Sequence, residues 1–494
     1  MNRAEDRNAP WREELRRRLT TRERTSIPRA QMPVLEPEYR ITCNEEVNRG
    51  LSDEQAVMEA SRCLDCPDPQ CVGGCPVEIR IPDFIKRIER GAFTEAAAVL
   101  RQTSALPAVC GRVCPQEKQC ESRCIYNRMK KPPVAIGYLE RFAADYERTE
   151  RKDNPTLDTV PAVEPNGIRI AVAGSGPAGL TFAGDMALRG YDVTVYEALH
   201  EIGGVLKYGI PEFRLPNSIV EAEIKGLERL GVKFVKDCVI GKTLGLDDLR
   251  KAGFRGIFVA SGAGLPRFMG IPGENYIGVM SSNEYLTRIN LMGAGRPGED
   301  TPVLKGRRVA VIGGGNTALD SVRTAVRQGA EKAMIIYRRS EAEMPARIEE
   351  VAHAKEEGVE FMTLANPVEY LADENGRVRA MRLQRMELGE PDEAGRRRPV
   401  AIEGDIDEVE ADLVIVSVGV SPNPLIPHAF RELKVSGRGT IEVDGKTMES
   451  SVEGLYAGGD IVRGGATVFL AMGDGRNAAK AMHEAIEKSE NKDK

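Results

Sequence analysis

Two stretches of the chain each combine a short β-branched strand, a glycine-rich loop and a helix. The first runs from the strand 168–172 into Gly174-Ser-Gly-Pro-Ala-Gly179, and the second from the strand 308–312 into Gly313-Gly-Gly-Asn-Thr-Ala318. Glycines in such a loop allow a tight turn and a close approach of the backbone to a pyrophosphate, and the start of the helix faces its charge. A second strand follows each helix at the expected distance, which removes most chance matches. The chain is therefore predicted to hold two Rossmann-like dinucleotide-binding domains of the α/β class.

The residue that ends the second strand of each unit distinguishes the two nucleotides. After the first unit it is Glu197, whose carboxylate accepts hydrogen bonds from ribose hydroxyls and repels a 2′-phosphate, so this site suits FAD or NAD. The second unit ends in Arg338 and Arg339, and a guanidinium pair can hold a 2′-phosphate, which favours NADP. The alternative for these arginines is a solvated or ion-paired face. Arg347 lies close enough in sequence to assist.

A third glycine motif lies near the C-terminus, where Gly458-Gly459-Asp460 precedes Gly464-Gly-Ala-Thr-Val468. An aspartate at a strand end can bind a hydroxyl of the cofactor, and a following helix N-terminus can stabilise negative charge on a reduced flavin ring. Alone, this motif is often an ordinary turn. Together with the first glycine loop and Gly203-Gly204, it resembles the FAD domain of flavoproteins with two dinucleotide-binding domains. The resemblance implies a glutathione-reductase-like fold in which the NADP domain splits the FAD domain.

These motifs supply the candidate cofactor-binding residues. For FAD they are Gly174, Gly176, Pro177, Ala178, Gly179, Glu197, Gly204, Gly459, Asp460, Ala466, Thr467 and Val468. For NADP(H) they are Gly313, Gly315, Asn316, Thr317, Ala318, Arg338, Arg339 and Arg347. No side chain is assigned as catalytic, because hydride transfer between stacked nicotinamide and flavin rings needs orientation rather than an acid or base.

Eight of the ten cysteines fall between Cys63 and Cys124, with the spacings C-x2-C-x4-C-x3-C-P and C-x3-C-P-x4-C-x3-C. Short spacings let one loop supply neighbouring corners of a cluster, and a Cys-Pro at the end of a run is a feature of ferredoxin loops. A four-thiolate zinc site and a secreted disulfide module are the alternatives. We expect a reducing compartment, because the sequence shows no export signal, and there clustered cysteines indicate metal. Eight cysteines could fill two [4Fe–4S] clusters with no remainder.

The remaining sequence predicts the domain organisation. A net charge of −6 gives no general basis for binding nucleic acid, and the absence of an apolar run of about 18 residues predicts no membrane span, so a cytoplasmic protein is expected. Residues 45–150 are typical of helices, notably at 53–62 and 82–100. The Arg-rich start is expected to be a solvated arm around a short helix at 11–19, or alternatively a subunit-docking arm. A polar linker is expected at 148–166. The predicted domains are an arm at 1–44, a helical domain binding two [4Fe–4S] clusters at 45–165, an FAD domain at 166–300 and 425–494, and an NADP(H) domain at 301–424.

The cysteine pattern combined with the two nucleotide motifs resembles the glutamate synthase small-subunit family and the electron-donor part of dihydropyrimidine dehydrogenase, from about residue 30 onward. The resemblance implies a different set of cluster ligands from the one that the spacings indicate. One cluster would take Cys63, Cys66, Cys71 and Cys124, and the other Cys75, Cys114, Cys120 and Glu140. Spacing alone would instead make Cys110 a ligand and Glu140 a surface helix residue.

The family resemblance implies two main roles. One is to supply NADPH electrons to a glutamate synthase large subunit. The other is to act as the large (beta) subunit of NADH-dependent ferredoxin:NADP oxidoreductase, which the stretches 264–274, 283–292 and 384–407 resemble. In that group electron bifurcation occurs: one electron goes to NAD through a partner subunit with its own flavin and a [2Fe–2S] cluster, and the other goes through the clusters to ferredoxin. A sulfide dehydrogenase-type relative and a non-catalytic electron conduit are further alternatives.

Overall fold

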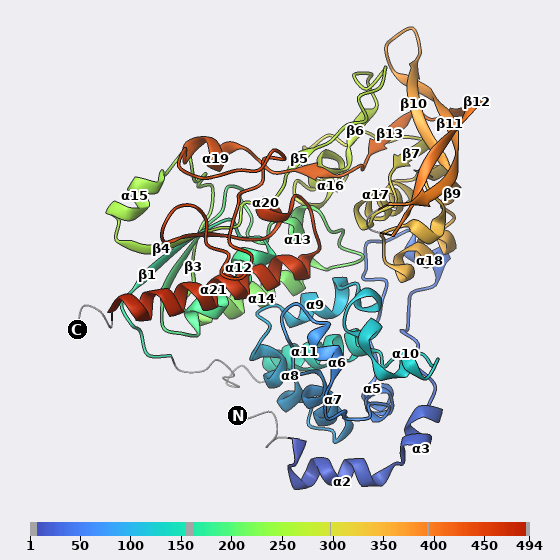
Figure 1. Cartoon of the computed structure of the whole chain (residues 1–494). Coiled ribbons are helices and arrows are strands. Elements are labelled where there is room, and N and C mark those ends of the chain that lie inside the picture. The colour runs from blue at the N-terminus through green and yellow to red at the C-terminus, as the bar shows by residue number, and fades with distance from the viewer. Residues whose placement is uncertain (1–6, 154–162, 297, 393–394, 491–494) are drawn as a thin grey trace.

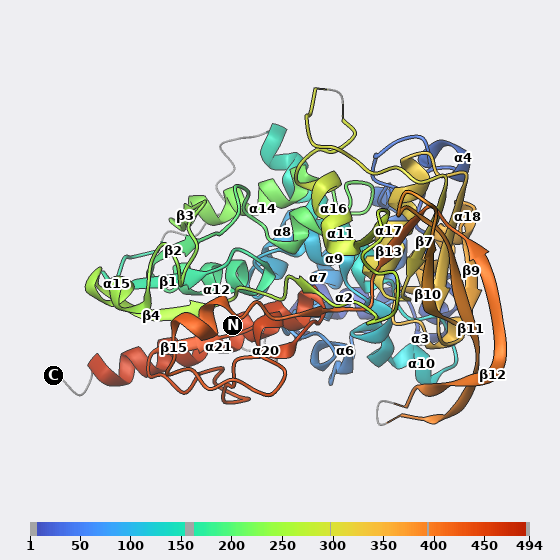
Figure 2. The same ribbon diagram turned by 90° about the horizontal axis from the view of Figure 1, so that it is seen from above.

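The computed structural model of the protein describes residues 7–153, 163–296, 298–392 and 395–490. It contains a helical N-terminal part and two parallel sheets flanked by helices, which lie next to one another above the helical part in Figure 1 and are seen from above in Figure 2. The middle of the predicted linker 148–166 lies outside the described residues. In the described ranges, no helix combines the length and apolar character needed to cross a membrane.

The N-terminal part is built from helices, as expected. The helix expected at 53–62 is α5, in which the Ser52 hydroxyl accepts a hydrogen bond from the Gln55 N–H (3.3 Å) and so caps the first turn. The helix expected over 82–100 is two helices, because Gly91 between them adopts a left-handed backbone (φ 79°). The helices are α2 (Pro10–Arg18), α3 (Thr21–Ser26), α4 (Pro37–Arg40), α5 (Asp53–Ser61), α6 (Gln70–Gly73), α7 (Ile81–Glu89), α8 (Phe93–Arg101), α9 (Pro107–Val113), α10 (Ile125–Arg128) and α11 (Ile136–Asp153).

The N-terminal arm is solvated only in part: Arg17 and Arg18 of α2 are exposed, but other arginines of the arm are buried. Arg12 on α2 is buried and pairs with Asp65 (2.5 Å) and Asp83 (2.6 Å). Arg24 on α3 is also buried and pairs with Glu89 at 2.8 Å. These buried arginines neutralise acids of the cysteine-rich region, because buried charges require partners.

The first parallel sheet has the strand order β15-β4-β1-β2-β3. β15, the last of these strands along the chain, comes from near the C-terminal end and pairs with β4. The helices α12 and α21 pack closely against each other, since a Cβ on Gly475 of α21 would lie 2.4 Å from the Ala178 carbonyl oxygen of α12. The elements of this part are β1 (Arg169–Ala173), α12 (Pro177–Ala187), β2 (Asp192–Tyr196), α13 (Val205–Tyr208), α14 (Asn217–Arg229), β3 (Lys233–Val235), α15 (Leu246–Lys251), β4 (Phe254–Val259), α19 (Leu425–Ala429), β15 (Leu455–Ala457), α20 (Asp460–Arg463) and α21 (Val468–Glu490).

The second parallel sheet has the order β6-β13-β7-β8-β9 and carries a three-stranded antiparallel ribbon. The chain enters this part after β4 and returns before β15, and the two crossings pair as β5 (Leu265–Pro266) and β14 (Val420–Ser421). The other elements are β6 (Val279–Ser281), α16 (Ser282–Asn290), β7 (Arg308–Ile312), α17 (Asn316–Arg327), β8 (Lys332–Tyr337), α18 (Ile348–Glu356), β9 (Glu360–Thr363), β10 (Ala365–Ala372), β11 (Val378–Pro391), β12 (Arg397–Glu410) and β13 (Leu413–Val416).

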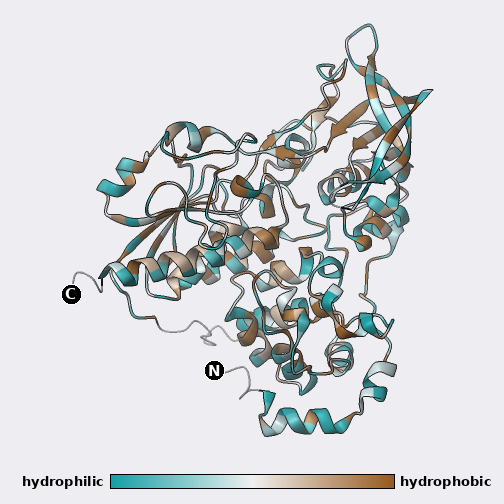
Figure 3. Ribbon diagram, viewed as in Figure 1, coloured by the Kyte–Doolittle hydropathy of each residue, from teal (hydrophilic) through white to brown (hydrophobic). Residues whose placement is uncertain are grey.

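The fold class is the one expected, with one nucleotide-binding part inserted into the other. In Figure 3 the parallel strands are mostly brown, while the outer helices are largely teal, as expected for strands buried on both faces. The numerical domain boundaries given above stay predictions.

Candidate active site

A cavity of about 1570 Å³ lies between the two sheets, at the ends of β1 and β7 that carry the glycine loops. Parallel α/β sheets bind ligands at this end of their strands, and the volume exceeds the roughly 300–1,000 Å³ of a single small-molecule site. The predicted residues that line it are Gly174, Gly176, Pro177, Ala178, Glu197, Gly204, Gly459, Asp460, Ala466, Thr467, Val468, Gly313, Gly315, Asn316, Thr317, Arg338 and Arg339. Gly179, Ala318 and Arg347 are not among its lining residues.

The glycine loops have the space that a dinucleotide needs. A Cβ built on Gly176 or on Gly315 would meet no atom within 4 Å. By contrast, a Cβ on Gly174 would lie 2.4 Å from the Ala260 carbonyl oxygen, and one on Gly179 would lie 2.0 Å from the Gly174 carbonyl oxygen. Gly174 and Gly179 therefore allow α12 to pack against the sheet, while Gly176 and Gly315 leave the room that a pyrophosphate would fill.

Glu197 fixes the first glycine loop as well as facing the cavity. Its Oε2 accepts hydrogen bonds from the Ser175 N–H (2.9 Å) and hydroxyl (2.5 Å), and its Oε1 accepts from the Leu199 N–H (2.9 Å). A carboxylate oxygen has two acceptor positions, so Oε1 keeps one for a ribose hydroxyl. The residue is buried at the end of β2, where its charge would oppose an additional phosphate.

The C-terminal motif also contributes to this end of the cavity. The Asp460 carboxylate accepts a hydrogen bond from the Ala466 N–H at 2.8 Å, and burial raises the Asp460 pKa. Burial also raises the pKa of Tyr208 to about 12, and the charges of Asp460 and Glu197 add to that shift. Asp460 and Glu197 therefore place carboxylate acceptors for hydroxyl groups at this end of the cavity.

The two arginines at the end of β8 differ in exposure and in their partners. Arg339 is buried, donates to the Arg397 carbonyl oxygen (2.8 Å) and lies 3.2 Å from Asp392. Arg338 is exposed and has no ion pair within the described residues. Arg396 of the ribbon lines the same cavity. The ion-paired alternative thus describes Arg339, whereas Arg338 presents an uncommitted guanidinium.

Arg347 lies at the junction with the helical part rather than beside the nucleotide cavity. Its buried guanidinium donates to the Arg112 carbonyl oxygen (2.7 Å) and to Gln116 Oε1 (3.1 Å). Its backbone N–H donates to Asn316 Oδ1 at 2.9 Å, within the second glycine motif. The assistance to a 2′-phosphate expected from its sequence position does not fit this placement, because the guanidinium is bound to the cysteine-containing loop. Arg347 instead joins that loop to the second nucleotide motif.

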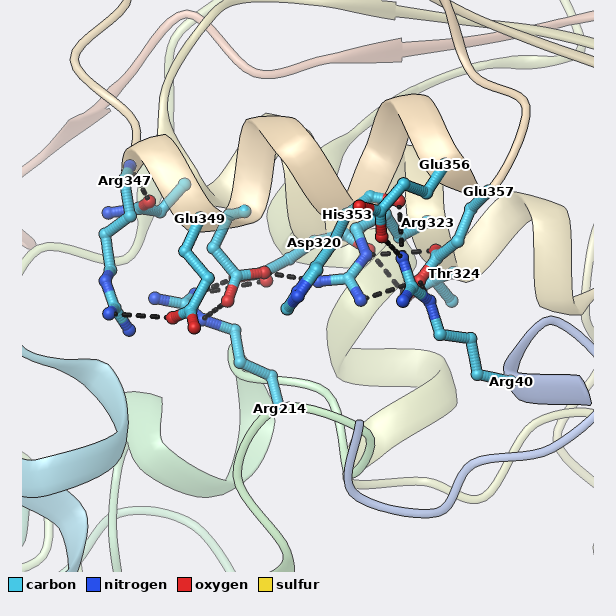
Figure 4. Close-up of polar contacts among 12 residues, drawn as sticks. Arg40, Arg214, Asp320, Arg323, Thr324, Arg347, Glu349, His353, Glu356 and Glu357 are labelled. Carbon is cyan, nitrogen blue, oxygen red and sulfur yellow. Dashed lines mark hydrogen bonds and ion pairs between the residues drawn. The ribbon is translucent and has the colours of Figure 1, made fainter. Parts of the chain in front are cut away.

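A buried ion network joins all three parts of the chain (Figure 4). Arg214, which follows α13, pairs with Asp320 of α17 at 2.8 Å. Arg323, one turn further along α17, pairs with Glu357 just beyond α18, also at 2.8 Å. Arg40 of α4 reaches the same Glu357 carboxylate at 2.8 Å. Although burial opposes its ionisation, hydrogen bonds from Arg323 hold the pKa of Glu357 well below its usual range.

The first predicted ligand group comes together near the protein surface. Burial raises the pKa of Cys71, and the nearby thiols of Cys63, Cys124 and Cys66 raise it further. Burial likewise raises the pKa of Cys63 to about 12. Cys66, Cys71 and Cys124 are partly exposed, whereas Cys63 is buried. These four cysteines are therefore near one another, and their assignment to one cluster stays a prediction.

The second predicted group is buried. Burial raises the pKa of Cys114 well above its ordinary value, with further contributions from Cys120, Glu140, Cys110 and Cys75. Glu140 is not the surface residue that spacing indicated: it is buried, its Oε1 has no hydrogen-bond partner in the described ranges, and burial raises its pKa to about 8.

The donor sets fit iron–sulfur clusters in their chemistry. In the part of the chain that the structure describes, no three His, Cys, Asp or Glu side chains converge closely enough to hold a single metal ion. A [4Fe–4S] cluster instead spreads its thiolate ligands over separate corners. One partly exposed and one buried group of four donors provide such sets, and the unpartnered oxygen of Glu140 would gain a partner in the buried one.

Val113, Pro115 and Arg396 are among the lining residues that the sequence reasoning missed. Val113 and Pro115 line the nucleotide cavity and flank Cys114, so the wall of the cavity includes the loop that carries a predicted cluster ligand. The Cys-Pro dipeptide was noticed only as a cluster signal. Arg396 was the third, and the run Arg396-Arg397-Arg398 in the 384–407 stretch was its available signal.

Known proteins resemble this chain along most of its length. A family model described as dihydropyrimidine dehydrogenase domain II, 4Fe–4S cluster, matches residues 40–152, and one described as pyridine nucleotide-disulphide oxidoreductase matches 168–485. The glutamate synthase [NADPH] small chain of Azospirillum brasilense is 39% identical over 89% of this chain and 90% of that one. The NADP(+)-dependent formate dehydrogenase subunit beta of Moorella thermoacetica is 38% identical over 84% of this chain, which spans 60% of that relative. The structure of Mycobacterium tuberculosis FprA in complex with NADPH shares the fold, with a TM-score of 0.55 at 20% identity over 66% of this chain and 86% of that one.

Proposed function

The chain belongs to the glutamate synthase small-chain family and is an NADP-dependent FAD and iron–sulfur oxidoreductase, and from this premise we propose that it exchanges hydride between NADP(H) and FAD and passes single electrons through two [4Fe–4S] clusters to a partner subunit. When bound, the flavin accepts a hydride from the nicotinamide and releases the electrons one at a time.

One observation carries the proposal. The cavity that holds both glycine loops is also lined by Val113 and Pro115, the two neighbours of Cys114. The nucleotide sites and the buried ligand group are therefore separated by a single loop. A chain that only bound nucleotides would not need this wall of its cavity to carry a buried thiol.

The residues of this chain bind and orient. The loops at Gly176 and Gly315 receive the two pyrophosphates, Glu197 receives a ribose, and Arg338 receives the 2′-phosphate of NADP. The buried ion network between Arg214 and Asp320 holds the second nucleotide-binding part against the first, which fixes the relative position of the two rings. No side chain is required to move a proton.

The finer proposal concerns the fate of the electrons. We place this chain as the bifurcating subunit of an NADH-dependent ferredoxin:NADP oxidoreductase in the cytoplasm, with a partner subunit that reacts with NAD(H) and with ferredoxin as the other acceptor. The resemblance of the stretches 264–274, 283–292 and 384–407 supports it. The second candidate is the electron-donor subunit of a glutamate synthase, which the match to the Azospirillum brasilense protein along 90% of its length favours.

Anaerobic mixing with NADPH tests the hydride step. We expect NADPH to bleach the flavin absorbance. NADH should bleach it far more slowly, since Arg338 favours a nucleotide with a 2′-phosphate. A flavin that stays oxidised with NADPH would leave only the role of a non-catalytic electron conduit. Equal bleaching by NADH would contradict the role of Arg338.

Purification of the tagged chain from its host separates the two enzyme roles. A partner of moderate size that carries a flavin and a [2Fe–2S] cluster would support bifurcation. A much larger amidotransferase chain would support glutamate synthase and refute bifurcation.

A further inference from the structure

Exposed basic side chains lie beside the partly exposed cysteine group, whose own loop also carries two exposed acids, Asp68 and Glu78. Helix α10 begins directly after Cys124, and four side chains on and beside it, all exposed, form what we call the basic surface: Arg123, Arg128, Lys130 and Lys131. Within the described residues none of the four forms an ion pair. The acid of this stretch, Glu121, is buried and pairs with Arg29 at 2.8 Å.

The buried arginines of the helical part, by contrast, are neutralised by carboxylates. Arg12, Arg24 and Arg62 are buried and each pairs with a buried carboxylate at 2.5 to 2.8 Å. Of the four side chains of the basic surface, Lys131 donates a hydrogen bond to the Thr25 carbonyl oxygen (2.7 Å), and none is neutralised by a carboxylate within the described residues. Concentrated charge of one sign steers and orients a partner of the opposite sign.

The basic surface lies over the first ligand group. A Cβ on Gly74 would lie 2.9 Å from Cγ of Arg123, and Gly74 stands between Cys71 and Cys75 in sequence. Met129, with 39% of its surface exposed, adds an apolar residue among the cations. Cys66, Cys71 and Cys124 are partly exposed, whereas Cys75, Cys114 and Cys120 are buried. Because single-electron transfer weakens steeply with distance, electrons leave from the group that approaches solvent.

We propose that the basic surface is the docking site of an acidic electron-carrier protein, which exchanges single electrons with the cluster held by Cys63, Cys66, Cys71 and Cys124. The proposal rests on the proposed function, in which electrons leave through the clusters. Complementary charge brings the partner to this face and sets its orientation, while Met129 gives the contact an apolar centre. In each transfer one electron passes from the reduced cluster to the oxidised carrier, with no bond formed or broken.

A charge-reversal pair tests this surface without disturbing the ligands. The test variant is Arg128→Glu with Lys130→Glu, and the matched control is Arg250→Glu with Lys251→Glu, an exposed pair on α15 at the opposite side of the molecule in Figure 1. The full chain is reduced with dithionite, freed of excess reductant and mixed anaerobically with an oxidised, strongly acidic bacterial ferredoxin. A parallel mixing uses the basic protein cytochrome c. Iron content and EPR spectra establish that each variant keeps its clusters.

We expect the test variant to reduce the ferredoxin at least about 10-fold more slowly than the parent at low salt, and to lose most of the parent's salt dependence. Cytochrome c reduction by the test variant should become faster, and the control pair should match the parent. The proposal is overturned if the parent fails to reduce the ferredoxin, or if the test and control variants slow it equally. Dithionite bypasses the nicotinamide, so failure of the proposed hydride function is seen separately, as absence of bleaching by NADPH.

Discussion

The guanidinium of Arg347 lies 3.1 Å from Oε1 of Gln116, across the junction between the second nucleotide-binding part and the helical part. Gln116 stands two residues after Cys114, and the Arg347 backbone N–H binds Asn316 of the second glycine motif. One residue thus contacts both a predicted NADP(H) loop and a predicted cluster loop. If nucleotide binding shifts α17, these two hydrogen bonds of Arg347 transmit the shift to the Cys114 loop.

The variant Arg347→Met should disturb the cluster loop rather than the phosphate site. Removal of the guanidinium leaves the Arg112 carbonyl oxygen and Gln116 Oε1 buried without their donor, at a cost of about 2–3 kcal/mol. We expect a lower melting temperature and an altered EPR spectrum, with little change in NADPH affinity. An unchanged EPR spectrum together with weakened NADPH binding would reverse our placement of this residue.

The variant Arg338→Ala should have the complementary effect. The loss of one charged hydrogen-bond donor to the 2′-phosphate should weaken NADPH binding about 10- to 100-fold and leave NADH binding unchanged. Titration of the two nucleotides against the oxidised protein measures both constants. If NADH binding weakens as much as NADPH binding, the guanidinium does not contact the 2′-phosphate.

The variant Glu140→Ala should remove or convert one of two clusters. The carboxylate is buried with an unpartnered Oε1, so its loss deprives the second group of a donor. Iron content per chain and EPR spectra measure the change, and Cys110→Ala is the matched control, since Cys110 is buried beside Glu140. If Cys110→Ala loses iron while Glu140→Ala does not, the ligand assignment must be exchanged between them.

The variant Glu197→Ala should lose FAD on desalting. Its carboxylate holds the Ser175 and Leu199 N–H groups, so truncation loosens the first glycine loop and removes the acceptor for the ribose. The flavin-to-protein ratio after gel filtration is the measurement. Glu201→Ala is a control in the same loop, where the carboxylate pairs with Lys207 and is 38% exposed. Equal flavin retention by both variants would contradict the role of Glu197.

The variant Asp320→Asn should change how stability depends on pH. Burial raises the pKa of Asp320 from 3.8 to about 6, although Arg214 lies only 2.8 Å away. A folded pKa above the unfolded one means that this group's contribution to stability falls as pH rises from about 4 to about 6. The melting temperature of the variant relative to the parent should therefore rise between about pH 4 and pH 6, by the equivalent of roughly 2 kcal/mol. A difference that stays constant with pH would show that Asp320 is ionised throughout.

Local signals predicted the elements that carry the nucleotide sites. The glycine loops, the strand-ending Glu197 and the Arg338–Arg339 pair are set by short-range geometry, and most of these residues line the cavity. Gly91 was a visible break in the helix expected over 82–100, and it was overlooked because the apolar spacing continued across it.

Contacts between distant segments could not be predicted in the same way. The composition around Arg12 and Arg24 indicates a solvated arm, and only the folded chain places Asp65, Asp83 and Glu89 beside them. Arg347 lies near the NADP motif in sequence, yet nothing local indicates that the cysteine loop docks there. Which cysteines of the two runs share a cluster likewise depends on the tertiary arrangement, and the spacing of the cysteines does not reveal it.

Strand β15 completes the first sheet from near the far end of the polypeptide, beside β4. On the ribosome, the four other strands of that sheet and the whole second sheet are made before β15 emerges. The NADP side is thus able to fold while the FAD side still has an open strand edge. A premature stop upstream of residue 455 leaves β4 unpaired on that side, and such an edge invites pairing with other chains and recognition by quality-control proteases.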